Sequence, residues 1–149
     1  MACVIETDIT INADASRVWA VVSNLADYAN WNPFLVHAAG RPEAGERLSV
    51  CAARADGRRV DFRPVVLMAA APMHLRWLAR RWPLSGLLDI EQGFVIEPRE
   101  VSSAVHVVQR VRLEGFFALV LRRRLEAELF ERCAAMNAAL KRRVEAERD

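Results

Sequence analysis

Apolar and polar side chains alternate along much of the chain, and this pattern predicts a series of β-strands. In residues 4–11, Ile5, Ile9 and Ile11 share one face while Glu6 lies on the other. The alternation recurs in residues 48–52, 60–66, 74–80, 89–97 and 105–114. Alternation with a period of two is typical of strands with one face on a core and one face toward solvent, as in antiparallel sheets.

A short helical region is predicted after the first strand. Asn12-Ala13-Asp14 offers a helix cap, through either the Asn or the Asp side chain, and Val18, Val22 and Leu25 follow at helical spacing. Pro33 disfavours the helical conformation at the residue before it, so the chain should become extended there.

Turn signals separate the predicted strands. Residues 40–45 and 83–86 break the alternation, and Asp56-Gly57 is the strongest signal for a two-residue hairpin turn. Pro64 falls inside the segment 60–66, which predicts an edge position or a bulge.

The pattern changes to a helical one after Gly115. Apolar residues at spacings of three and four run from Leu125 to Val144 and predict a C-terminal helix of about 25 residues. No repeat or linker divides the chain. The sequence therefore predicts one α+β domain over residues 1–149, with an antiparallel sheet, two short helices after the first strand and a long C-terminal helix across the concave face.

Composition limits the partners to be expected. The 149 residues are 53% hydrophobic, and a domain of this size buries roughly 70% of its unfolded surface. The formal charge of +2 is too balanced to indicate nucleic-acid binding. The longest apolar runs, residues 65–72 and 116–121, are far shorter than the roughly 20 residues of a membrane-spanning helix, so no stable membrane insertion is expected.

Cysteines and histidines give no sign of a disulfide, metal or cofactor site. Cys3, Cys51 and Cys133 are far apart and form no CxxC pair, and the three histidines are dispersed as well. The N-terminal residues lack the basic start and apolar stretch of a signal peptide. We therefore expect a cytoplasmic protein without metal or cofactor. No nucleophile elbow, HExxH or phosphate-binding loop is present.

Gln92 and Gln109 are the sharpest binding candidates, because each lies on an otherwise apolar strand face. A buried amide without partners costs about 1–3 kcal/mol, so each must meet a polar group. They either fix the polar end of a ligand or bond to each other, the backbone or water.

Large apolar side chains are candidates for a pocket wall, although the same residues could equally form the core. The set comprises Trp31, Phe34, Phe62, Trp77, Phe94 and Met136.

Several fragments together resemble the START/polyketide-cyclase-like (SRPBCC) superfamily. They are Val18-Trp19, Trp31-Asn32-Pro33-Phe34, Phe62-x-Pro64-x-Val66, Leu75-x-Trp77, Phe94-x-Ile96-Glu97-Pro98, Gln109-x-Val111-x-Leu113-x-Gly115 and residues 136–140. The resemblance implies a helix-grip fold, in which a curved antiparallel sheet wraps around the C-terminal helix and encloses an apolar pocket. Many relatives carry a His in place of Gln92 and a Glu in place of Val111, so this chain lacks an ionisable pair that could serve acid–base catalysis.

The leading hypothesis is a binding protein for a hydrophobic small molecule such as a lipid, polyketide or isoprenoid. The ligand would lie between sheet and C-terminal helix, and this helix and the Trp31–Phe34 segment would frame the entrance. The predicted site residues are Trp31, Phe34, Phe62, Trp77, Gln92, Phe94, Gln109 and Met136. The oligomeric state stays open, with a homodimer as one option.

Two other classes remain open. A cyclase or dehydratase would need an inward acid or base such as His37, Asp61 or Glu91. A protein-interaction module without a pocket would show a filled core and an exposed apolar patch. The basic clusters at residues 122–124 and 141–143 fit either solvated helix faces or contacts with acidic headgroups or a partner.

Overall fold

The computed structural model describes residues 3–80, 88–99 and 103–146, so the break predicted at residues 83–86 lies outside the described residues. Its elements are, in chain order, β1 (Cys3–Ile11), α1 (Ala15–Ser23), the 3-10 helix η1 (Leu25–Asn30), β2 (Leu35–Ala39), β3 (Ser49–Ala53), β4 (Arg59–Phe62), β5 (Val65–Ala70), β6 (His74–Arg80), β7 (Asp89–Pro98), β8 (Val105–Glu114), α2 (Phe116–Val120) and α3 (Arg122–Ala146).

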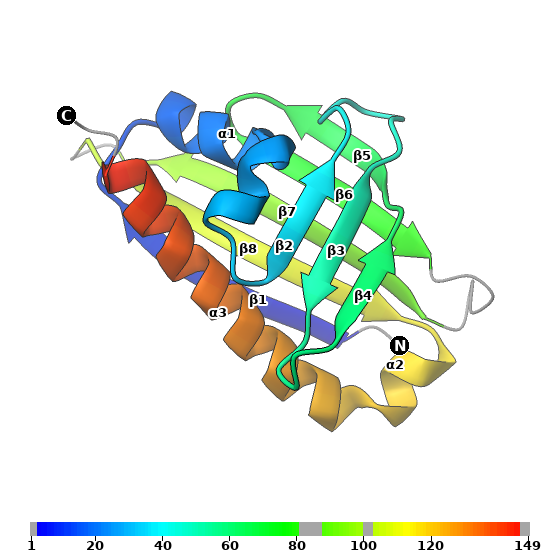
Figure 1. Ribbon diagram of the computed structural model, residues 1–149. Helices are drawn as coiled ribbons and strands as arrows, with labels where there is room; N and C mark the ends of the chain where they lie inside the picture. The colour runs from blue at the N-terminus through cyan, green and yellow to red at the C-terminus, as the bar shows by residue number, and fades with distance from the viewer. Residues whose placement is uncertain (1–2, 81–87, 100–102, 147–149) are drawn as a thin grey trace.

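The described strands form two antiparallel groups. One has the order β1-β8-β7-β6-β5 and the other the order β2-β3-β4. Backbone hydrogen bonds from Leu48 N to Pro64 O (2.7 Å) and from Val66 N to Glu46 O (2.9 Å) join the groups into one curved surface. Figure 1 shows β2–β4 facing the larger sheet, with α3 (orange to red) along the side where β1 and β8 lie. The predicted α+β helix-grip architecture is confirmed.

Two local predictions differ from the structure. The segment 60–66 is divided at Pro64, which lacks an N–H group, so that β4 pairs with β3 while β5 pairs with β6. The turn that contains Asp56-Gly57 has a loop of three residues, 55–57, where two were predicted. Arg54 and Arg58 close this loop with a hydrogen bond from Arg54 N to Arg58 O at 2.7 Å. Gly57 adopts a φ of 86°, as a type I turn followed by a left-handed residue requires.

The segment before β2 is built by its own side chains. Of the two side chains predicted as possible caps, Asn12 and Asp14, it is Asp14 that caps α1, accepting from Arg17 N at 2.9 Å. Asn32 Oδ1 accepts from the backbone N–H groups of both Phe34 and Leu35 at 2.9 Å. These two hydrogen bonds turn the chain from η1 into β2 and hold Phe34 in a fixed position.

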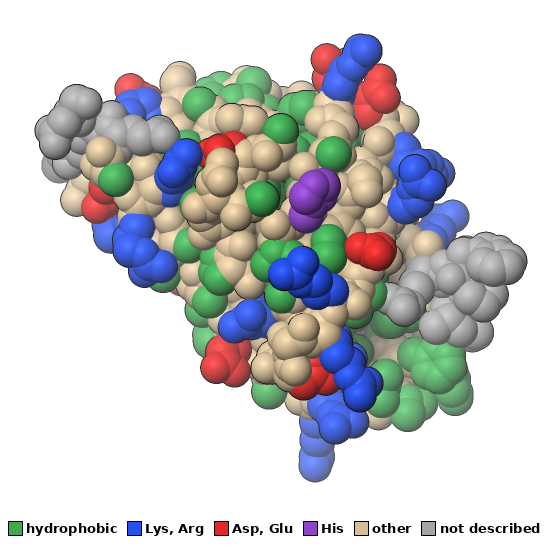
Figure 2. Space-filling model, in the orientation of Figure 1, with side chains coloured by type: hydrophobic (Ala, Val, Ile, Leu, Met, Phe, Trp, Pro, Cys, Tyr) green, Lys and Arg blue, Asp and Glu red, His purple; other side chains and the backbone are tan. Residues whose placement is uncertain are grey.

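Helix α3 is 25 residues long, in agreement with the predicted length. Its inward face is buried at Cys133, Met136, Leu140 and Val144. No helix among residues 3–80, 88–99 and 103–146 is long and apolar enough to cross a membrane. Figure 2 shows hydrophobic side chains gathered at the end of the molecule where Figure 1 places α2.

Candidate functional site

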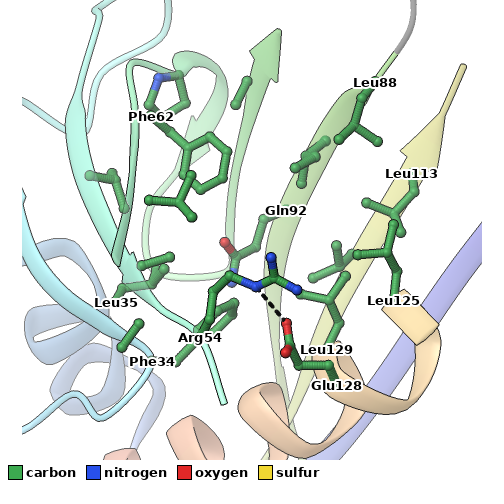
Figure 3. A pocket seen from close by; sticks show the side chains of 18 of the residues that line it. Phe34, Leu35, Arg54, Phe62, Leu88, Gln92, Leu113, Leu125, Glu128 and Leu129 are labelled. Carbon is green, nitrogen blue, oxygen red and sulfur yellow. Dashed lines mark hydrogen bonds and ion pairs between the residues drawn. The ribbon is translucent and has the colours of Figure 1, made fainter. Parts of the chain in front are cut away.

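A cavity of about 490 Å³ lies between the two groups of strands and the N-terminal half of α3. The strands β2, β3, β4, β6, β7 and β8 and the helices α2 and α3 supply most wall residues. The connecting segments supply Phe34, Arg54, Pro64, Leu88 and Leu121. Figure 3 shows side chains from these elements converging on one space. The structure thus has the internal space that an interaction module with a filled core would lack.

The cavity wall is mostly apolar. Arg54, Gln92, Arg124 and Glu128 are its polar or charged side chains among the described residues, and the other 18 are aliphatic or aromatic. Arg54 Nε lies 3.2 Å from Glu128 Oε2, and these side chains are 40% and 22% exposed. The ion pair therefore lies where the cavity opens to solvent and links the β3–β4 hairpin to α3 (Figure 3).

A hydrogen-bonded chain of side chains, here called the amide network, forms the inner limit of the cavity. Gln92 Nε2 donates to Gln109 Oε1 at 2.7 Å, and Gln109 Nε2 donates to Asn137 Oδ1 at 2.7 Å. Asn137 Nδ2 donates to Thr7 Oγ1 at 2.9 Å. The network runs across β7, β8 and β1 to α3, and it explains how four buried polar side chains are stabilised in an apolar interior.

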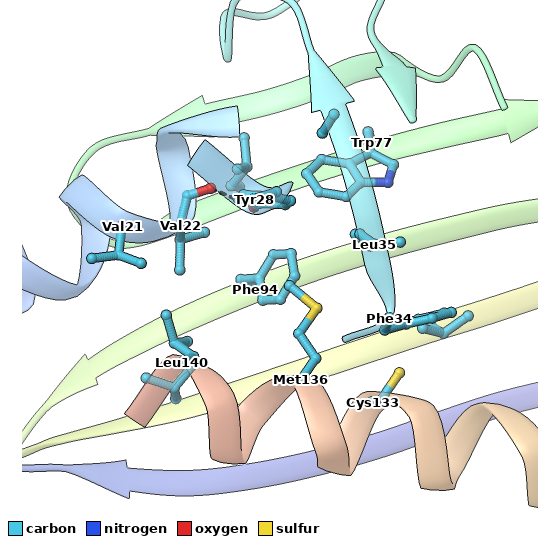
Figure 4. Close-up of a cluster of buried hydrophobic side chains, with 14 of the residues drawn as sticks. Val21, Val22, Tyr28, Phe34, Leu35, Trp77, Phe94, Cys133, Met136 and Leu140 are labelled. Carbon is cyan, nitrogen blue, oxygen red and sulfur yellow. Dashed lines mark hydrogen bonds between the residues drawn. The ribbon is translucent and has the colours of Figure 1, made fainter. Parts of the chain in front are cut away.

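The interior beyond the amide network is a packed core. Phe94 and Met136 are fully buried there, beside Tyr28 and Leu140 (Figure 4). Helix α3 spans both regions, because Leu125 faces the cavity whereas its residues from 133 onward pack in the core. The cavity therefore occupies one end of the molecule and the core the other.

The structure brings half of the predicted site residues into the cavity wall. Phe34, Phe62, Trp77 and Gln92 line it. Figure 3 labels three of these, Phe34, Phe62 and Gln92, around the same space.

The other four predicted residues lie outside the cavity wall. Gln109 accepts a hydrogen bond from Gln92, and Phe94 packs on Trp77 with ring centroids 5.7 Å apart. Met136 is fully buried in the core. Trp31 packs edge-on against Tyr28, with a centroid distance of 5.3 Å.

Sequence reasoning missed Arg54, Glu128 and Asn137. Arg54 belongs to a turn and Glu128 to a polar helix face. Neither position has a local sequence pattern that indicates a cavity. Asn137 had a detectable signal, because it follows Cys133 by four residues and precedes Leu140 by three. That spacing places an amide on the apolar face of α3.

The acid–base candidates considered from the sequence do not reach the cavity. His37 and Asp61 are exposed, and Glu91 pairs with Arg76 at 3.1 Å. The described residues contain no cluster of His, Cys, Asp and Glu that could hold a metal ion. Burial raises the pKa of the Cys133 thiol to about 12, so this cysteine is protonated and unreactive at neutral pH.

Solved structures share the fold of this chain. The di-domain ARO/CYC BexL from the BE-7585A biosynthetic pathway has a TM-score of 0.75 at 18% identity, covering 98% of this chain and 51% of BexL. The chain thus spans about half the length of BexL. The Zhui aromatase/cyclase from Streptomyces sp. R1128 has a TM-score of 0.77 at 15% identity, covering 97% of this chain and 94% of its own. A START superfamily protein from Mycobacterium smegmatis has a TM-score of 0.71 at 20% identity, covering 96% and 97%.

At these identities the likeness establishes the helix-grip fold alone. A search of curated proteins finds no match for the chain. Residues 2–145 match the family described as "Polyketide cyclase / dehydrase and lipid transport". Because this match covers nearly all of the 149 residues, the chain belongs to that family, within the START/polyketide-cyclase-like (SRPBCC) superfamily.

Proposed function

We propose that this protein binds a hydrophobic small molecule, such as a lipid, polyketide or isoprenoid, in the cavity between its strands and α3. The observation that carries the proposal is the size and character of the cavity. Its volume of about 490 Å³ lies within the usual range for small-molecule sites, and its wall is almost wholly apolar.

The cost of the cavity supports the same conclusion. Empty apolar volume in a protein interior costs on the order of 24 cal/mol per Å³, and the chain could have filled this volume with larger side chains. Ala52 and Ala79 instead leave the space open. A molecule that binds the folded protein would offset this loss of stability.

Each predicted residue has a proposed role in this function. Phe34, Phe62 and Trp77 contact the ligand directly, and Gln92 supplies a polar contact in the wall. Gln109 and Phe94 act indirectly, by holding Gln92 and Trp77 in place. For Trp31 and Met136 the packing supports a structural role.

The test is native mass spectrometry of the freshly purified protein, followed by solvent extraction of any bound compound. We expect an apolar compound at near-stoichiometric occupancy, and we expect Phe62→Ser to lower that occupancy. A matched variant, Phe130→Ser, changes an exposed phenylalanine outside the cavity wall and should retain the compound. A ligand-free mass, with no thermal stabilisation by a panel of lipids and aromatic compounds, would contradict the proposal.

A second candidate function is cyclase or dehydratase chemistry, and one observation favours it. Glu128 places a carboxylate in the cavity wall beside the Arg54 guanidinium, so an acid–base group and a cation face the same space. If this function holds, the extracted compound should change mass during incubation with the protein, and Glu128→Gln should abolish that change while binding persists. A compound that stays unchanged on prolonged incubation identifies the protein as a binder.

The proposed setting is a reducing, cytoplasmic compartment. All three cysteines are free, and Cys3 and Cys133 are buried apart from each other on β1 and α3. This arrangement supports a fold that needs no disulfide.

A further inference from the structure

The amide network ends at the cavity with an unused acceptor. Gln92 is only 5% exposed, and its Nε2 donates to Gln109 Oε1. Within the part of the chain that the structure describes, Gln92 Oε1 accepts no hydrogen bond. Figure 3 shows the side chain projecting from β7 among the residues of the cavity wall. This carbonyl oxygen faces an otherwise apolar part of the cavity and receives no donor from the protein, so a donor on a bound molecule would satisfy it.

The orientation of the amides follows from two backbone carbonyls, which can only accept. Thr7 Oγ1 donates to Gln109 O at 3.5 Å, so the Thr7 hydroxyl is left to accept from Asn137 Nδ2. Asn137 Oδ1 must then accept from Gln109 Nε2, which also lies 3.4 Å from Cys133 O. Gln109 consequently turns its oxygen toward Gln92. Gln92 must donate to that oxygen, and its own oxygen remains for the cavity.

We propose that the ligand binds Gln92 Oε1 through a hydroxyl or N–H donor, so that the cavity prefers alcohols and phenols to the corresponding ketones and ethers. This inference rests on the proposed binding function. A ketone at the same place would bring two oxygen acceptors together, which is repulsive. A hydroxyl would extend the amide network by one hydrogen bond and satisfy its last acceptor.

The test compares 9-fluorenol with 9-fluorenone, which share a ring skeleton and differ in donor and acceptor. Dissociation constants are measured by isothermal titration calorimetry with the wild-type protein and with Gln92→Met, which keeps the length of the side chain and removes the amide. We expect the wild-type protein to bind fluorenol about tenfold more tightly than fluorenone. In Gln92→Met the ratio of the two constants should approach one.

Ile90→Val is the matched control, because Ile90 lines the same cavity on the same strand without a polar group. It should weaken both compounds alike and leave their ratio unchanged. Equal wild-type affinities, or tighter binding of fluorenone, overturn the inference while leaving the binding function in place. If neither compound binds, and no lipid or aromatic compound of a wider panel binds either, the proposed function fails and this inference fails with it.

A separate observation concerns the surface of α2. Phe116, Leu119 and Val120 are 60%, 55% and 60% exposed, which is unusual for large apolar side chains. Arg122 and Arg123 follow at once and are exposed as well. Arg122 pairs with Glu126 at 3.0 Å, whereas Arg123 forms no ion pair among the described residues. Phe116, Leu119, Val120, Arg122 and Arg123 are here called the α2 surface. Apolar side chains next to cations are typical of segments that lie on anionic membranes.

We infer that the α2 surface docks on an anionic membrane. A second copy of the chain fits this surface poorly, because a two-fold contact would bring the arginines of both copies together. A membrane instead offers negative charge to the arginines and an apolar medium to Phe116. The surface also adjoins the cavity, since Phe117 and Leu121, which lie between its residues in the sequence, line the wall. A hydrophobic ligand could therefore pass between membrane and cavity without crossing water.

The test is co-sedimentation with phosphatidylcholine vesicles, with and without phosphatidylglycerol. Only vesicles that contain phosphatidylglycerol should bind the wild-type protein, and added salt should weaken binding. Phe116→Ser and Arg123→Glu should each reduce binding about tenfold. Phe130→Ser, which changes a side chain 55% exposed on α3 and outside the α2 surface, should not. Wild-type protein that fails to bind anionic vesicles, or that instead dimerises through this surface, overturns the inference.

Discussion

Single polar side chains fix the arrangement of the interior, and Gln109 is the central one. Gln109 is fully buried and bonds to both Gln92 and Asn137. Gln109→Leu leaves Gln92 Nε2 without an acceptor and Asn137 Oδ1 without a donor in an apolar region. We expect the free energy of unfolding to fall by about 2–4 kcal/mol, measured by urea denaturation.

The control for this prediction is a double-mutant cycle with Asn137→Leu. Removing both members of a hydrogen-bonded pair leaves fewer orphaned groups than removing one. The double variant should therefore lose less stability than the sum of the two single variants. Strictly additive losses would show that the two amides do not interact in solution.

His74 predicts how stability depends on pH. Burial lowers the pKa of this histidine, and Arg76 and Arg110 lower it further against the opposing effect of Glu91. In the unfolded chain the pKa returns to about 6.5. As the pH falls through that value, the unfolded state binds more protons than the folded state, so stability decreases toward acid.

Thermal unfolding between about pH 7.5 and pH 5.5 measures this effect. The midpoint should fall toward the acid end, and His74→Gln should reduce the slope because glutamine does not titrate. His37→Gln is the matched control, since His37 is exposed. An identical slope in His74→Gln and wild type would refute the assignment to His74.

At the scale of elements, the β3–β4 hairpin and α3 are joined by the ion pair of Arg54 and Glu128 where the cavity opens. Exposed pairs of this kind contribute little, so Arg54→Gln should change the free energy of unfolding by less than about 1 kcal/mol. It should nevertheless release a bound fluorescent ligand several times faster, because the hairpin is then free to move away from the helix. Stopped-flow dilution measures this release.

Arg58→Gln provides the comparison for Arg54→Gln. Arg58 belongs to the same hairpin and pairs with Asp56 at 3.7 Å, but its side chain is 82% exposed and does not line the cavity. Its removal should leave the release rate unchanged. Equal release rates for Arg54→Gln and the wild-type protein would show that the ion pair does not restrict access to the cavity.

The sequence predicts elements well where burial has a local pattern. Val105, Val107 and Leu113 alternate with polar residues because one face of β8 lies inside, and that face is visible in the sequence itself. The division of the strands at Pro64 is different in kind. It depends on which distant strands supply hydrogen bonds to each side of the proline, and a local pattern carries no such information.

At the scale of the whole molecule, the sequence identifies which residues face inward but not which of them meet a cavity. Trp77 and Phe94 both lie on inward strand faces, yet only Trp77 lines the cavity while Phe94 is in the core. Leu125 and Met136 likewise share one apolar stripe of α3 and meet different surroundings. The difference arises from how far apart the opposing walls are, which is a property of the assembled fold.

Because the interior is a cavity at one end and a packed core at the other, an Ala→Leu substitution should change the free energy of unfolding in opposite directions on β3 and on β2. Ala52 on β3 faces the cavity, whereas Ala38 on β2 is 3% exposed in the packed core. Ala52→Leu should enter empty volume and raise the free energy of unfolding by about 1 kcal/mol, after the loss of side-chain freedom. Ala38→Leu should overpack the core and lower it by about 1–3 kcal/mol.

Ligand binding should respond in the reverse order. Ala52→Leu reduces the volume open to a ligand, so it should weaken binding of 9-fluorenol even as the protein becomes more stable. Ala38→Leu should leave the affinity of the remaining folded protein close to that of the wild type, because the cavity wall is not changed. Urea denaturation and calorimetric titration of both variants separate the two effects. A loss of stability in Ala52→Leu would mean that the space beside β3 is already filled in solution, and the cavity that supports the proposed function would then be absent.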